Sequence, residues 1–188
     1  EGTLRTAEAV REIEAMRAAA PDLIVGAGTI LSVDDIKAAT DAGAQFQVSP
    51  GASPALADAF VAQSLVALPG ISTASEAMAL YERGLSFLKF FPAAPAGGAS
   101  FIKALAGPLP QITFMPPGSI TPEPAPDYLA APNVAAVGGS WIATGAEIAA
   151  RDWAAIEAKA KQACALSGKA IAGERCAGDL TRRRRVLR

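Results

Sequence analysis

The chain has 188 residues, 51% of them apolar and 19% charged, and its formal net charge is −1 at pH 7. It contains no histidine, which excludes a histidine-based triad and a histidine-rich zinc site, so acid–base and nucleophilic chemistry falls to lysine, carboxylate, tyrosine or backbone groups. No apolar run reaches the roughly 18 residues of a membrane span, and no segment has the pattern of a signal peptide. We therefore expect a cytoplasmic protein without a membrane partner.

The last twenty residues differ in charge from the rest. Residues 169–188 hold seven basic and two acidic residues, which leaves ten basic and sixteen acidic residues in 1–168. A mildly acidic body disfavours nucleic acid as a partner. We predict one domain over 1–168 and a basic, disordered tail over 169–188.

Short apolar segments recur along the chain at intervals of about 20 to 25 residues, the spacing of alternating strands and helices. The predicted strands are 23–25, 46–48, 65–68, 87–91, 112–115 and 134–137, with a further strand ending within 1–6. The predicted helices are 7–19, 33–42, 54–63, 74–83 and 153–166. The second of these follows Ser32, a good N-cap, and stops before Gly43, a good residue for the position after a helix.

Strands that are apolar throughout and alternate with helices predict a parallel sheet. An open doubly wound sheet and a barrel both fit, but glycine and small polar residues follow every strand, which favours the (β/α)8 TIM barrel. No G-x-G-x-x-G follows a strand to favour a dinucleotide fold. Eight strands would require the first βα unit and most of the second strand before residue 1, so we expect an N-terminally incomplete barrel.

Lys89 is the strongest candidate for a catalytic residue. It lies at the centre of F-L-K-F-F at 87–91, and the two-residue period of a strand places Phe87, Lys89 and Phe91 on one face. If that face is the barrel interior, loss of water lowers the pKa of the amine and makes it a nucleophile toward a ketone. The alternative is a lysine at a strand end that reaches solvent.

Six motifs occur in order: E-x-T-L-R-T at 1–6, V-G-A-G-T at 25–29, S-P-G at 49–51, P-G-I-S-T at 69–73, K-F-F-P-A at 89–93 and G-G-S-W at 138–141. Together they resemble the 2-keto-3-deoxy-6-phosphogluconate (KDPG) and 4-hydroxy-2-oxoglutarate (KHG) aldolase family over residues 1 to about 168. The resemblance implies a class I aldolase that forms pyruvate through a Schiff base. It also implies a homotrimer and a reaction with no cofactor and no metal.

The resemblance assigns roles residue by residue. Lys89 matches the Schiff-base lysine, and Glu1 matches the general acid/base that works through a water molecule. The substrate carboxylate is held by Arg5 and Thr29, with backbone near Pro50 or Pro69. The substrate phosphate is held in the last two loops by Gly118, Ser119, Gly139 and Ser140.

The chain departs from the family pattern at three positions. Pro117 replaces a threonine in the phosphate loop and so removes a hydroxyl and an N–H, Ser119 replaces a glycine, and Gly2 stands where a strand would carry an apolar residue. Two alternatives therefore stay open: an aldolase for a non-phosphorylated 2-keto-3-deoxy sugar acid, and a catalytically impaired barrel fragment that acts only as an oligomer subunit.

Overall fold

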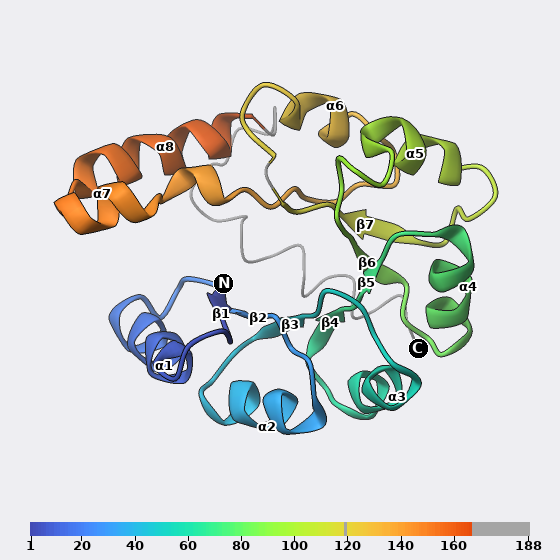
Figure 1. Ribbon diagram of the computed structural model, residues 1–188, viewed down its shortest axis with the longest axis horizontal. Helices are drawn as coiled ribbons and strands as arrows, with labels where there is room; N and C mark the ends of the chain where they lie inside the picture. The colour runs from blue at the N-terminus through green and yellow to red at the C-terminus, as the bar shows by residue number, and fades with distance from the viewer. Residues whose placement is uncertain (119, 167–188) are drawn as a thin grey trace.

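The computed structural model describes residues 1–118 and 120–166, and Figure 1 shows a curved sheet with helices around its outer side. Ser119 and the predicted tail 169–188 lie outside the described residues. The strands are β1 Gly2–Thr3, β2 Ala27–Gly28, β3 Phe46–Val48, β4 Val66–Leu68, β5 Gly70–Ile71, β6 Phe87–Phe90 and β7 Thr113–Met115. The helices are α1 Ala9–Ala19, α2 Val33–Asp41, α3 Pro54–Ala62, α4 Ala74–Glu82, α5 Gly98–Leu105, α6 Ala125–Leu129, η1 Ser140–Ile142, α7 Gly145–Ala150 and α8 Trp153–Ala165.

All strand pairs are parallel, in the orders β1-β2-β3-β4 and β5-β6-β7. The two sheets are continuous along the chain because β4 and β5 are halves of one extended segment, divided at Pro69. Two isolated bridges, Phe114 to Val134 and Pro117 to Gly138, add the segment 134–138 beside β7. Within the described ranges, no pairing joins that segment to β1, and the sheet is open on that side.

The two faces of the sheet carry different clusters of apolar side chains. A small inner cluster consists of Val48, Leu68 and Met115, with Phe46, Val66 and Phe87 packed against it. The much larger cluster on the other face is shared with the helices. Helices on one face and side chains alone on the other are the layers of a TIM-type barrel, whereas a doubly wound sheet has helices on both faces. The predicted barrel class is confirmed by this arrangement and by the solved structures compared below.

Five of the helices, α2, α3, α4, α7 and α8, begin at a polar side chain that caps them. The predicted N-cap Ser32 accepts a hydrogen bond from the Asp35 N–H, and the Asp35 carboxylate accepts from the Ser32 N–H, a capping box. The same carboxylate oxygen also accepts the Leu31 N–H at 2.8 Å. Gly43 follows α2 with φ +85°, as predicted for a glycine after a helix.

Boundaries differ from the predictions at two strands. The strand predicted over 23–25 is found at Ala27–Gly28, because Leu23 is 53% exposed and its carbonyl accepts from the Arg17 guanidinium in the connection after α1. The strand predicted over 134–137 is present only as the two bridges. Because these segments are held by non-local contacts, their apolar character placed them in the right part of the chain but not at the right residues.

Three helices were not predicted: α5, α6 and α7. The first begins at a glycine pair, the second is rich in proline and the third has six residues, and each of these features is typical of loops. In the part of the chain that the structure describes, no helix is both long enough and apolar enough to cross a membrane.

Candidate active site

Lys89 lies on the inner face of β6. Its Cα partners are Gly70 on β5 and Met115 on β7, and its neighbours Leu88 and Phe90 are buried on the helix side. Only 9% of Lys89 is exposed, and its Nζ lies 4.6 Å from the centroid of the Phe91 ring. The amine therefore points into the mouth of the barrel and not outward into bulk water.

Burial lowers the pKa of the Lys89 amine, and two charged residues act on it as well. The Glu1 carboxylate raises the pKa and the Arg5 guanidinium lowers it further, with burial the largest effect. The predicted cause of activation, loss of water, is the cause found. Of the two phenylalanines predicted on the same face as Lys89, Phe91 contacts the amine, whereas Phe87 packs in the inner apolar cluster.

Glu1 and Arg5 flank strand β1. Arg5 follows in the turn after β1, and its guanidinium acts on the Lys89 amine. Period two places Glu1 on the face opposite Gly2, whose α-carbon packs on α1, where a Cβ would lie 2.6 Å from Ile13 Cγ1. The departure at Gly2 thus has a physical reason, because a larger side chain would push α1 away from the strand. Leu4, which also faces α1, supplies apolar contact to the large cluster.

Glu1 extends across β2 at Gly28. A Cβ on Gly28 would lie 2.6 Å from the Glu1 carboxyl carbon and would overlap its oxygen. The carboxylate therefore occupies the space that any other residue at position 28 would fill. No functional role was predicted for Gly28 itself, although it lies in the V-G-A-G-T motif at 25–29.

Arg5 and Thr29 contact each other directly. Arg5 Nε donates to Thr29 Oγ1 at 3.3 Å, and Thr29 has φ +60°. A β-branched residue in the left-handed region is strained, and such strain is concentrated at functional sites. The segment is held on its far side, where the Ile30 N–H bonds to the Val48 carbonyl and the Ile30 side chain is fully buried.

The loops at Pro50 and Pro69 are packed tightly. The Pro69 ring is fully buried and its carbonyl accepts the Lys89 N–H at 2.9 Å. Gly70 has its α-carbon against the Pro50 carbonyl, where a Cβ would overlap it, whereas nothing lies within 4 Å of a Cβ on Gly51. The open space beside these loops is thus at Gly51.

The residues predicted to bind the phosphate lie on two neighbouring segments that are joined by one β-bridge. Pro117 pairs with Gly138, so Gly118 and Gly139 follow at the same level on neighbouring segments. Gly118 has φ +94° and lies over Phe91, where a Cβ would be 3.3 Å from the ring. Gly139 lies against the Trp141 indole, and exposed Ser140 begins η1. Phe91 thus lies between the Lys89 amine and the loop at Gly118.

Comparison with known protein families gives one family. The family model for "Aldolase: KDPG and KHG aldolase" matches residues 1–159. The chain belongs to the KDPG and KHG aldolase family. The confirmed resemblance also makes it a member of a family of carbon–carbon lyases.

Individual relatives agree with this family. The 2-dehydro-3-deoxy-phosphogluconate aldolase of Pseudoalteromonas atlantica is 43% identical over 88% of this chain and 77% of its own. The KDPG aldolase of Legionella pneumophila, solved with pyruvate captured as a covalent carbinolamine intermediate, superposes with a TM-score of 0.83 at 37% identity, over 86% of this chain and 79% of that one. The enzyme of Zymomonas mobilis with 3-phosphoglycerate superposes with a TM-score of 0.81 at 41% identity, over 86% and 76%.

Proposed function

We propose that this family member is a class I aldolase that cleaves KDPG to pyruvate and glyceraldehyde 3-phosphate through a Schiff base on Lys89. The same chemistry converts 4-hydroxy-2-oxoglutarate to pyruvate and glyoxylate. The observation that carries the proposal is Lys89, a residue that is only 9% exposed and whose amine has its pKa lowered by burial, with Glu1 and Arg5 close enough to act on it. The covalent pyruvate in the Legionella pneumophila enzyme supports the same chemistry here.

The reaction begins at the lysine. Burial favours the neutral amine, which attacks the C2 ketone to give a carbinolamine, and loss of water leaves an iminium ion. Its positive nitrogen stays at Lys89 Nζ, 4.6 Å from the Phe91 ring centroid, where the negative face of the ring stabilises a cation. The iminium is the electron sink for the next step.

Cleavage of the C3–C4 bond follows from removal of one proton. Glu1, acting through a water molecule, takes the proton of the C4 hydroxyl, the C4–O bond becomes a carbonyl, and the C3–C4 electrons flow into the iminium to form an enamine. The aldehyde product leaves. The enamine is then protonated at C3, and hydrolysis of the imine releases pyruvate and the free Lys89 amine.

Substrate is held at its two anionic ends. Arg5 and Thr29 bind the keto-acid carboxylate, because a guanidinium fork beside a hydroxyl suits a planar anion. Backbone near Pro50 and Pro69 completes this end. Gly118, Gly139 and Ser140 bind the phosphate, together with Ser119, and the 3-phosphoglycerate in the Zymomonas mobilis enzyme supports a phosphorylated ligand.

Borohydride trapping tests the proposal. The chain is reduced in the presence of pyruvate, and the peptide that contains Lys89 is analysed by mass. We expect an adduct at Lys89, none in Lys89→Ala, and an unchanged adduct in Lys103→Ala, whose lysine lies exposed on α5. A folded sample without an adduct at Lys89 would favour the inert barrel fragment.

A second candidate is the same cleavage of a non-phosphorylated 2-keto-3-deoxy sugar acid. It is favoured by Pro117, which has no N–H to donate to a phosphate and whose ring fills the space above Gly138, where a Cβ would lie 2.8 Å from the Pro117 Cβ. Comparing kcat/KM for KDPG and for its unphosphorylated analogue separates the two. Equal values would sink the phosphate assignment.

We propose a homotrimer that acts in the cytoplasm. Analytical ultracentrifugation tests the trimer, and fractionation of cells tests the location.

A further inference from the structure

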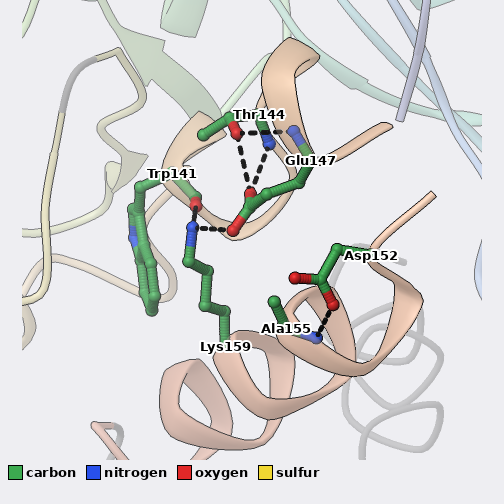
Figure 2. A network of polar contacts seen from close by, with 6 residues as sticks. All are labelled: Trp141, Thr144, Glu147, Asp152, Ala155 and Lys159. Atoms are coloured by element: carbon green, nitrogen blue, oxygen red, sulfur yellow. Dashed lines mark hydrogen bonds and ion pairs between the residues drawn. The ribbon is translucent and has the colours of Figure 1, made fainter. Parts of the chain in front are cut away.

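One lysine joins three consecutive elements at the end of the barrel (Figure 2). Lys159, on α8, donates to the backbone carbonyl of Trp141 in η1 at 3.2 Å and pairs with Glu147 of α7 at 2.5 Å. Glu147 is itself fixed, because its other carboxylate oxygen accepts the Thr144 hydroxyl at 2.8 Å and the Thr144 N–H at 3.1 Å. The Lys159 ammonium therefore binds an acceptor that cannot easily move.

Apolar packing contributes little to this part of the molecule. No residue of α7 or α8 is fully buried, and both helices lie beside η1 at the open side of the sheet in Figure 1. Because these two helices bury little apolar surface, polar contacts determine their position relative to η1. The Lys159 and Glu147 side chains are 32% and 18% exposed, against 75% and 67% for the pair of Lys161 and Glu157 within α8. Partial burial makes the first pair the stronger of the two.

Trp141 links the pair of Lys159 and Glu147 to Gly139 and Ser140, which precede it in the chain. Its indole lies against Gly139, where a Cβ would be 2.7 Å from both Cδ1 and Nε1 of the ring. Its carbonyl is the group that Lys159 holds. A shift of Trp141 would therefore move Gly139 and Ser140, the residues immediately before it.

We propose that Lys159 is a positioning residue for the end of the substrate remote from Lys89, acting through Trp141 on Gly139 and Ser140. The inference rests on the proposed function, which places the substrate phosphate at these residues. Lys159 touches neither the substrate nor the reacting atoms. Its task is to keep the last loop at the distance from Lys89 that a phosphorylated six-carbon acid spans.

Glu147 keeps its negative charge over a wide range of pH, so it can hold Lys159 throughout that range. The hydrogen bond from Lys159, followed by those from Thr144, lowers the pKa of this carboxyl to about 2. The Glu147 carboxylate therefore stays ionised in neutral and mildly acidic solution and remains an acceptor for Lys159.

The test is substrate selectivity in Lys159→Met, which keeps the length of the side chain and removes its charge. We expect KM for KDPG to rise about tenfold, since small misplacements of a binding group are costly, while KM for the unphosphorylated acid and the pyruvate adduct at Lys89 stay as in the wild type. Lys159→Arg, which can make both contacts, should restore KM for KDPG. Lys161→Met is the matched control on the same helix and should leave KM unchanged for both substrates.

The experiment distinguishes failure of the role proposed for Lys159 from failure of the phosphate assignment itself. If Lys159→Met keeps the wild-type KM for KDPG, or raises KM equally for both acids, the lysine has no positioning role even though the phosphate assignment stands. If the wild type itself has equal kcat/KM for both acids, the phosphate assignment fails and the inference fails with it.

Discussion

Replacing Gly28 with alanine should remove most activity without unfolding the protein. The new methyl would lie 2.6 Å from the Glu1 carboxyl carbon, whereas carbon atoms in contact lie about 3.5 to 4.0 Å apart. Glu1 must therefore retreat by about 1 Å, and its side chain can do so because Glu1 is exposed. A catalytic group misplaced by about 1 Å costs roughly a hundredfold in rate, or about 2.7 kcal/mol of transition-state stabilisation.

The assay compares kcat/KM for KDPG with the yield of the borohydride-trapped pyruvate adduct. Gly28→Ala should lose about a hundredfold in kcat/KM and still form the adduct, because Lys89 is untouched. Gly107→Ala is the control, since nothing lies within 4 Å of a Cβ there. In a Glu1→Gln background, Gly28→Ala should have little further effect, as two changes that act through one group are not additive.

The reasoning would be refuted by a Gly28→Ala variant with wild-type kcat/KM. It would also fail if the variant lost as much activity in the Glu1→Gln background as in the wild type. The methyl would then act through something other than the carboxylate.

Three further predictions follow from the charges and the backbone of the described residues. Because burial and Arg5 lower the pKa of Lys89, Arg5→Met should shift the inflection in the rate of borohydride trapping to higher pH, and an unmoved inflection would contradict the coupling. Thr29→Gly removes the acceptor of Arg5 and relieves a strained φ of +60°, so KM should rise about tenfold while urea unfolding shows equal stability or a gain of up to about 1 kcal/mol. Because the pKa of Glu147 is lowered from 4.5 to about 2, its stabilisation is complete above pH 4.5 and is lost as the pH falls toward 2. The stabilities of wild type and Glu147→Gln should then converge in acid, and Glu82→Gln, at an exposed position of α4, is the control.

Local patterns in the sequence predicted most of the strands and helices and the face of the strand on which Lys89 lies. Period-two alternation placed Lys89 on the inner face of its strand, and hydroxyl and glycine residues predicted the start and end of α2 at Ser32 and Gly43. These features depend on residues a few positions apart, so neighbouring residues alone determine them. The roles predicted for Glu1 and for the residues of the last two loops came only from resemblance to a family, because an isolated carboxylate or glycine carries no local signal.

The remaining features depend on contacts between distant parts of the chain. Parallel pairing of β1 with β2 sets Glu1 over Gly28, and pairing of Pro117 with Gly138 brings the last two loops together. The attachment of α8 through Lys159 could not be read from a helix whose lysines look alike in sequence. Local propensity determines which residues form a strand or a helix, but only the register between strands and the packing of helices decides which side chains share one site.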